Sequence, residues 1–203
     1  AQAKIAAGAV GVCVQKTAEA QVLADRGIDD IYISNQVIAP DKLARVARLA
    51  QQLQARSGQL ALAVDSLHCV QAVAQALAMH ADASTRLDVF VEIDVGQGRC
   101  GVAPGADALT LARAVANQPQ LRFAGLQAYQ GRAQHLRSLA ERRLAIAQAS
   151  AAVQHTLQVL AQAGLPAPLV TGAGTGTFAL EAASGLWGEL QAGSYLFMDA
   201  DYG

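Results

Sequence analysis

The feature that most constrains the fold is a regular alternation of apolar runs with helix-like stretches. Short runs rich in Val, Ile and Leu are each followed by a stretch rich in Ala, Gln and Arg with helical periodicity. The strand-like runs are 9–15, 30–34, 60–65, 88–94, 123–129, 168–172 and 190–198, and the helical stretches include 41–55, 67–81, 107–118 and 134–163. Because these runs are apolar on both faces and helices join them, the pattern predicts a parallel sheet covered by helices.

Counting the runs predicts a barrel. Seven strands preceded by a helix tail are completed most simply by one further strand at the N-terminus, which gives a (β/α)8 barrel, whereas an open doubly wound sheet is the alternative. No linker or internal repeat interrupts residues 1–203, so we expect one domain, a partial barrel. The first residue is not Met and lies within a helix-like stretch, and the last residues follow an apolar run, so we expect a fragment of a longer protein.

Helix-end signals support this division. Asp41 and Ser66 stand where N-caps are expected, while Gly58 and Gly164 lie just past helix ends.

Composition narrows the class of protein. Of 203 residues, 53% are hydrophobic and 15% charged, and the formal net charge is −1. That balance gives no support to nucleic acid or an anionic membrane as a partner. No apolar run reaches the roughly 18 residues of a membrane span, and no signal peptide begins the sequence. Cys13, Cys69 and Cys100 are widely spaced, which is typical of reduced thiols in a cytoplasmic protein.

In such a barrel the active site is built from residues that follow the C-terminal ends of the strands. Polar residues that follow the predicted strands are Gln15, Ser34, Asn35, Asp65, Asp94, Arg99, Gln127, Tyr129 and His135. We therefore expect these side chains to gather at one end of the barrel.

The stretch "TGAGTGT" (171–177) predicts a phosphate site. Its glycines bare backbone N–H groups and its threonines add hydroxyls, just before a helix-like stretch. The last two loops of these barrels commonly hold a phosphate, so Gly174–Thr177 would share it with Gly193 and Ser194. A plain tight connection is the structural alternative, and a dinucleotide site lacks the required acidic residue about 20 positions later.

Four motifs together carry a resemblance to a known family. "EIDVGQGRCGV", "GLQAYQGRAQH", "TGAGTGTF" and "ELQAGSYLFMDADYG" resemble the D-threonine aldolase family, and they occur in family order over nearly the whole chain. The resemblance implies a pyridoxal-phosphate enzyme with an alanine-racemase-type barrel, dependent on a divalent metal such as Mn, Zn or Mg. It implies cleavage of D-threonine and related D-3-hydroxy amino acids to glycine and an aldehyde.

The resemblance also implies residue roles. His135 would take the proton from the substrate β-hydroxyl, because imidazole titrates near neutral pH. Tyr129 would lie against the pyridine ring, Arg99 beside that ring or the substrate carboxylate, and Gln191 at the pyridine nitrogen. The cofactor-binding residues would be Gly174, Thr175, Gly176, Thr177, Gln191, Gly193, Ser194 and Gln15.

Two parts of the family site are not matched in this sequence. The lysine that carries the cofactor belongs to the first barrel strand and is expected before Ala1, because Lys4, Lys16 and Lys42 do not match its motif. The metal ligands are expected in a β-domain after Gly203, so no metal ligand is assigned within this chain. We expect the fragment alone to be inactive.

Other functions stay open. A D-serine or D-3-hydroxyaspartate dehydratase would share the same scaffold. A non-catalytic pyridoxal-phosphate-binding barrel would lack the second domain, and a third candidate is a barrel that binds a sugar or nucleotide phosphate. Relatives of this fold pair up, so a homodimer would use the face at the C-terminal ends of the strands.

Overall fold

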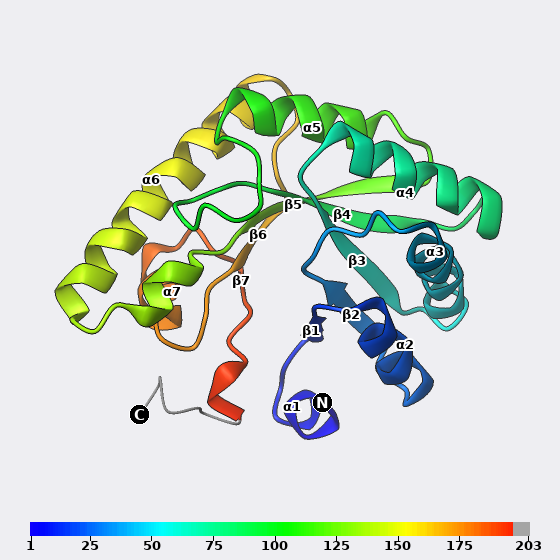
Figure 1. Cartoon of the computed structure of the whole chain (residues 1–203), viewed down its shortest axis with the longest axis horizontal. Coiled ribbons are helices and arrows are strands. Elements are labelled where there is room, and N and C mark those ends of the chain that lie inside the picture. Colours follow the sequence, from blue (N-terminus) through cyan, green and yellow to red (C-terminus); the bar gives the residue numbers. More distant parts are fainter. Residues whose placement is uncertain (197–203) are drawn as a thin grey trace. The chain divides into compact units, whose positions relative to one another are not determined.

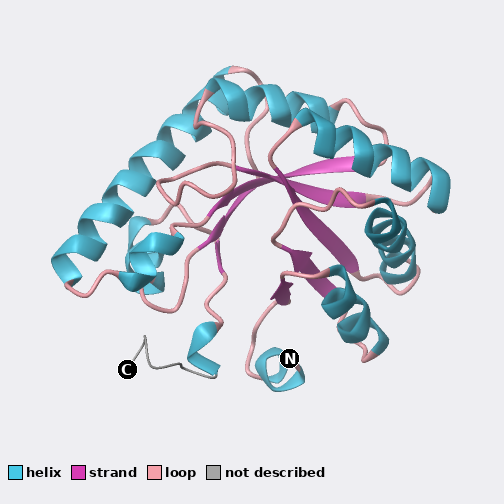
Figure 2. Ribbon diagram, viewed as in Figure 1, coloured by secondary structure: helices cyan, strands magenta, loops and turns pink. Residues whose placement is uncertain are grey.

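The computed structural model describes residues 1–196, in which strands alternate with helices (Figures 1 and 2). The strands are β1 (Val12–Val14), β2 (Asp30–Ile33), β3 (Gln59–Val64), β4 (Leu87–Glu92), β5 (Leu121–Ala128), β6 (Leu169–Gly172) and β7 (Glu189–Leu190). The α-helices are α1 (Gln2–Ala6), α2 (Thr17–Asp25), α3 (Pro40–Gln54), α4 (Leu67–His80), α5 (Ala106–Ala116), α6 (Leu139–Gln162) and α7 (Phe178–Ser184), and the 3-10 turns are η1 (Gly131–His135) and η2 (Ser194–Leu196). The strands follow one another in a single sheet in chain order, so the predicted β/α alternation is confirmed.

Contacts divide the chain into two compact units. Unit 1 comprises residues 1–90 and 113–123, and unit 2 comprises residues 91–112 and 124–203. The division passes through β4, α5 and β5. The prediction that residues 1–203 form one domain stays a prediction.

In unit 1, β2 pairs in parallel with both β1 and β3. Ile31 lies opposite Leu60 and Ile33 opposite Leu62, and all four side chains are buried. Helices α2, α3 and α4 follow one side of these strands (Figure 1). Helix α3 turns a buried stripe inward at helical spacing, namely Leu43, Val46, Leu49 and Leu53.

In unit 2, β6 pairs in parallel with both β5 and β7. Gly125 of β5 lies opposite Leu169 with φ +140°, and a Cβ at this position would overlap the Leu169 carbonyl oxygen. Only glycine therefore permits this close approach. Helix α6 buries Ile146, Val153 and Leu160 at helical spacing.

Two predicted elements are wrong in their bounds. The helix predicted over 134–163 begins at Leu139, because Ser138 and Glu141 form a capping box that starts α6 there. Gln134 and His135 instead belong to η1. The strand predicted over 190–198 ends at Leu190, since the Gly193 carbonyl accepts the Leu196 N–H at 3.1 Å and closes η2; residues 197–198 lie outside the described residues.

The predicted helix ends are partly confirmed. Ser66 caps α4 by accepting the Cys69 N–H at 3.2 Å, and Gly164 follows α6 with φ +74°. Asp41 is not an N-cap, because the cap is Ala39 and Pro40 takes the first helical position, where its missing N–H costs nothing. After α3 the left-handed residue is Ser57 (φ +63°), not Gly58.

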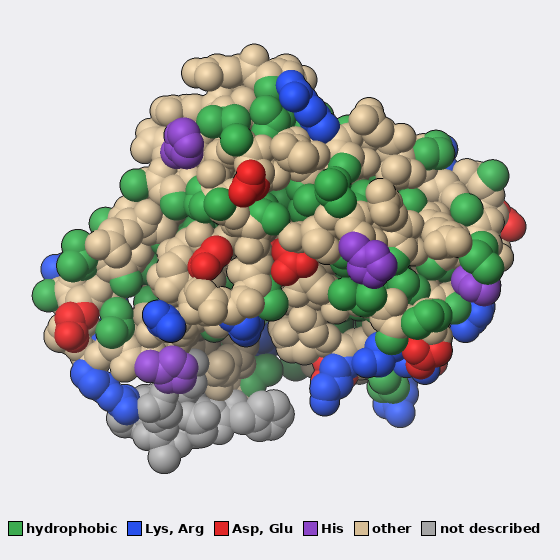
Figure 3. Space-filling view, turned by 45° about the horizontal axis from the view of Figure 1, so that its top comes forward, with side chains coloured by type: hydrophobic (Ala, Val, Ile, Leu, Met, Phe, Trp, Pro, Cys, Tyr) green, Lys and Arg blue, Asp and Glu red, His purple; other side chains and the backbone are tan. Residues whose placement is uncertain are grey.

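Hydrophobic and uncharged side chains cover most of the face seen in Figure 3, with acidic and basic side chains interspersed. Among residues 1–196, no helix is both long and apolar enough to cross a membrane.

Candidate active site in unit 2

All but one of the residues to which the resemblance assigns a role lie in unit 2, on the segments that follow β4, β5, β6 and β7. The exception, Gln15, lies in unit 1 just after β1. Its side-chain amide donates to the Ser34 hydroxyl at 2.8 Å, and its backbone carbonyl accepts from the Asn35 side-chain amide at 3.2 Å. Gln15 is thus part of a local polar cluster that joins the ends of β1 and β2.

The loop after β4 carries Arg99, and Asp94 shapes it. Asp94 Oδ1 accepts the N–H groups of Gly96 and Gly98 at 2.9 and 3.0 Å, and both glycines have positive φ. The loop then returns to its strand, where the Val102 carbonyl accepts the Asp94 N–H at 2.9 Å. This closed loop holds Arg99 as an exposed side chain.

The segment after β5 carries two predicted catalytic residues. Tyr129 follows the strand directly and is half-buried, whereas His135 ends η1 and is exposed. The intervening Gln130 is buried, and its amide donates to the Val95 carbonyl at 3.0 Å. Gln130 thereby joins this segment to the loop that bears Arg99.

The loop after β6 is the predicted phosphate loop, and Gln134 supports it from η1. Gln134 Oε1 accepts the Gly176 N–H at 2.7 Å, and its Nε2 donates to the Thr177 hydroxyl at 2.8 Å. The Thr177 hydroxyl in turn donates to Glu181 Oε1 at 2.8 Å. Sequence reasoning missed Gln134, although it precedes His135 in the quoted "GLQAYQGRAQH" motif.

These contacts divide the predicted phosphate-binding residues into two groups. The N–H of Gly176 is bonded to Gln134, and that of Thr177 to the Gly174 carbonyl at 3.2 Å. Within residues 1–196, the N–H groups of Gly174 and Thr175 have no such internal acceptor. The C-terminal half of the loop is thus held by internal hydrogen bonds, whereas the N–H groups of Gly174 and Thr175 are not.

The loop after β7 meets this loop directly. The Tyr195 N–H donates to the Thr175 hydroxyl at 3.1 Å, which brings the Gly193–Ser194 segment alongside Thr175. A Cβ at Gly193 would meet only the Gln191 carbonyl oxygen, at 3.8 Å, so the described residues leave that position open. The two loops that are predicted to share one phosphate are therefore in direct contact.

Gln191 is held in one orientation. The Thr171 hydroxyl donates to Glu189 Oε1 at 2.6 Å, because a carboxylate can only accept. Thr171 must then accept, and Gln191 Nε2 donates to it at 2.7 Å and to Gln127 Oε1 at 2.8 Å. The amide nitrogen of Gln191 therefore faces the two strands β5 and β6.

One buried acid lies below the phosphate loop. Glu181 is 1% exposed, and burial raises the pKa of its carboxyl above the ordinary value. Among residues 1–196, no cluster of three or more His, Cys, Asp or Glu side chains has a metal-binding arrangement.

Comparisons with known proteins identify the family and the fold of this chain. The family model described as "Alanine racemase, N-terminal domain" matches residues 1–201. A D-threonine aldolase from Arthrobacter sp. is 44% identical over 200 residues, which are 98% of this chain and 51% of the relative. A 3-hydroxy-D-aspartate aldolase from Paracoccus denitrificans (strain Pd 1222) is 41% identical over 196 residues, 97% of this chain and 49% of that relative.

Among solved structures, the D-threonine aldolase from Filomicrobium marinum superposes with a TM-score of 0.93 at 44% identity, covering 100% of this chain and 52% of that one. The chain spans about half the length of the curated relatives it matches.

Proposed function

The chain belongs to the alanine racemase N-terminal domain family, and we propose that it is the barrel part of a lyase that cleaves D-threonine and related D-3-hydroxy amino acids to glycine and an aldehyde. The family and fold expected from the four motifs are confirmed by the match over residues 1–201 and by the TM-score of 0.93. The observation that carries the proposal is that residues 130–135, which end at His135, bond through Gln130 to the loop of Arg99 and through Gln134 to the loop of Thr175, all within one unit.

The phosphate loop suits pyridoxal phosphate. Thr175 and Gly174 offer backbone N–H groups, and Gly193 leaves the adjoining position open. We propose that Gly174, Thr175, Gly193 and Ser194 contact the phosphate, whereas Gly176 and Thr177 hold the loop in place. Gln15 stays a proposed cofactor contact. Pyridoxal phosphate, when bound, supplies an electron sink for the substrate α-carbon.

The chain's own residues would orient and deprotonate the substrate. His135 would accept the β-hydroxyl proton at an imidazole nitrogen, since imidazole titrates near neutral pH. Tyr129 would pack against the pyridine ring, and Arg99 would bind the substrate carboxylate or lie beside the ring. Gln191 would approach the ring nitrogen and, being uncharged, would not enforce its protonation.

The proposal also requires a lysine and a divalent metal. Lys4 lies in α1, Lys42 in α3, and Lys16 precedes α2 as its N-cap, so we assign none of them to the cofactor. The described residues do not suit a metal by themselves. We propose that the cofactor-bearing lysine and the metal ligands lie outside residues 1–196. Homodimerisation and a cytoplasmic location also remain proposals.

The test is product analysis with the full-length protein and D-threonine. Glycine and acetaldehyde in equal amounts are expected. Ammonia and a 2-oxo acid would contradict the lyase proposal and identify a dehydratase.

A second measurement separates an enzyme from a binding protein. Intact mass after borohydride reduction should rise by one pyridoxal phosphate, fixed to a lysine. Cofactor bound without turnover of any D-3-hydroxy amino acid would contradict the enzyme and leave a binding barrel.

A further inference from the structure

Gln134 is an uncharged side chain whose bonds all lead to one loop. It is only 7% exposed, and both ends of its amide bond to residues 42 and 43 positions later in the chain. A buried amide bonded at both ends holds its neighbours in one arrangement, because breaking either bond leaves a polar group without a partner. The position of Gln134 therefore determines that of the phosphate loop.

The donors and acceptors permit one orientation of this amide. The Gly176 N–H can only donate, so the oxygen of Gln134 must face it and the nitrogen must face Thr177. Thr177 accepts from Gln134 and therefore gives its own proton to Glu181. The chain of bonds runs in one direction from the loop backbone to the buried acid.

Packing adds a second constraint. A Cβ at Gly174 would lie 2.5 Å from Gln134 Cδ, so any side chain there would displace the amide. On the other side of the same loop, Arg142 Nη1 donates to the Gly176 carbonyl at 3.0 Å. The Gly176 residue is thus bonded at its N–H and at its carbonyl.

We propose that Gln134 is a positioning residue that joins the placement of His135 to the shape of the phosphate loop. Gln134 and His135 are neighbours in η1, so the bonds that fix the loop also fix the backbone from which the imidazole projects. This inference rests on the proposed function, in which the loop binds phosphate and His135 acts as a base. A change at Gln134 should therefore lower both cofactor affinity and turnover.

The experiment uses the full-length protein. Gln134→Ala should raise the Kd for pyridoxal phosphate roughly tenfold, the effect of about one lost buried hydrogen bond, and should lower kcat with a smaller change in KM. The control is Gln54→Ala, because Gln54 also accepts a backbone N–H (Arg86, 2.8 Å) and donates to a carbonyl (Ser84, 3.1 Å) but is exposed and lies in unit 1. Gln54→Ala should leave Kd and kcat unchanged and change Tm little, because water replaces exposed hydrogen bonds.

A second pair of variants covers the case in which Gln134→Ala does not fold. Thr177→Val should weaken pyridoxal phosphate binding more than Thr177→Ser does, because serine keeps the hydroxyl that bonds Gln134 and Glu181. Gly174→Ala should also weaken it, and this loss should shrink in a Gln134→Ala background because the amide that it displaces is already gone.

Three results distinguish a failure of the positioning role of Gln134 from a failure of the proposed lyase reaction. Wild-type Kd and kcat in folded Gln134→Ala, or in Thr177→Val, would overturn the positioning role. If the wild type binds pyridoxal phosphate but releases no aldehyde from D-threonine, the proposed reaction fails, and the Kd series still tests Gln134. A wild type that binds no pyridoxal phosphate would overturn both.

Discussion

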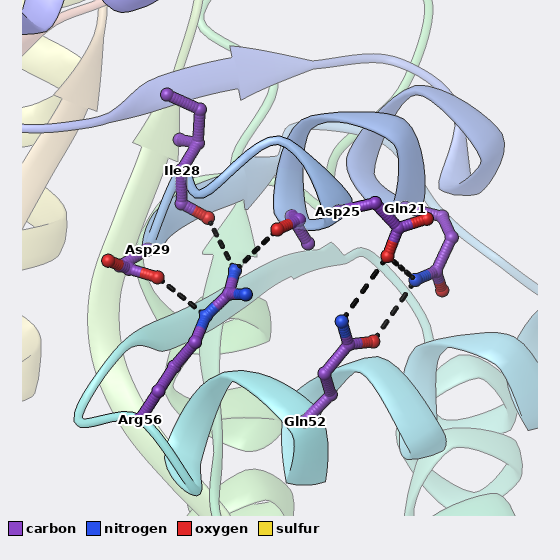
Figure 4. Close-up of polar contacts among 7 residues, drawn as sticks. Gln21, Asp25, Ile28, Asp29, Gln52 and Arg56 are labelled. Atoms are coloured by element: carbon purple, nitrogen blue, oxygen red, sulfur yellow. Dashed lines mark hydrogen bonds and ion pairs between the residues drawn. The ribbon is translucent and has the colours of Figure 1, made fainter.

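Two polar clusters, one in each unit, differ in how far their side chains are exposed to water. In unit 1, Arg56 donates to the carbonyls of Ala24 and Ile28 at 2.8 and 3.0 Å and pairs with Asp29 at 2.6 Å (Figure 4). The Arg56 and Asp29 side chains are 33% and 54% exposed. In unit 2, Gln134, Thr177 and Glu181 form their chain of bonds at 7%, 2% and 1% exposure.

The difference in exposure determines how much each cluster tolerates the loss of a hydrogen-bond partner. Water competes for the exposed Arg56–Asp29 ion pair, which therefore contributes roughly 0–1 kcal/mol. In the buried cluster no solvent replaces a lost partner, and the full desolvation cost of the orphaned group appears. Unit 1 therefore tolerates change in its cluster, whereas unit 2 does not.

Removing the central hydroxyl of the buried cluster should have the largest effect. Thr177→Val keeps the side-chain shape but leaves Gln134 Nε2 without its acceptor and Glu181 Oε1 without its donor. We expect the free energy of unfolding to fall by about 2–3 kcal/mol. Urea denaturation of the full-length protein measures it, and a change below about 0.5 kcal/mol would remove the distinction between the two clusters.

Glu181→Gln should reveal the cost of the buried charge. Because the folded pKa of Glu181 is raised, its contribution to stability is fully present below the ordinary value of 4.5 and is lost as pH rises through the folded pKa. Glutamine keeps an acceptor for Thr177 and does not ionise, so the variant should gain roughly 1 kcal/mol on the wild type at pH 8 and lose that advantage near pH 4. Tm measured across this pH range checks the sign, and parallel curves would contradict it.

Arg56→Ala should have a smaller effect in the opposite cluster. Because the Arg56–Asp29 ion pair is exposed, we expect a loss of about 0.5–1 kcal/mol that shrinks in 1 M NaCl. Arg56→Lys is the matched control, which keeps the charge but not the fork of donors. A loss as large as that of Thr177→Val would mean that exposure does not separate the clusters.

Asp25→Asn should have the smallest effect. Hydrogen bonds from Gln21 and Gln52 lower the pKa of Asp25, which is fully exposed. The stability that it contributes is present above pH 3.8 and is lost as pH falls through its lowered pKa. At pH 7 the variant should have a Tm only slightly below that of the wild type, and the difference should vanish as the pH falls through the lowered pKa. A large drop in Tm at pH 7 would show that even this exposed site is tightly constrained.

The sequence predicted the strands and loops better than the hydrogen bonds that connect distant loops. Apolar runs mark the strands, and "TGAGTGT" marks the loop after β6, because both signals are local. The role of Gln134 is not local, since its partners lie more than 40 residues away and an amide carries no charge to draw attention. The start of α6 was recoverable, because Ser138 and Glu141 stand at capping-box spacing.

The strand predicted over residues 190–198 was too long, because it rested on their apolar character and not on the turn residues in "AGSY". Gly193 and Ser194 favour a turn, and the last pairing with β6 is the Gln191 N–H to the Gly172 carbonyl at 2.7 Å. The residues predicted for the phosphate site lie after β6 and β7, and their phosphate role stays a prediction. Their individual contacts depend on bonds between loops that no single stretch encodes.

The capping box that begins α6 has a consequence for protein engineering. Ser138 and Glu141 satisfy the first turn of the helix from within, so α6 does not depend on η1 for its start. Two crossovers, one at Arg137 and one after Gln162, would therefore let recombination exchange the whole 24-residue helix between homologous genes while the segment bearing His135 is inherited intact.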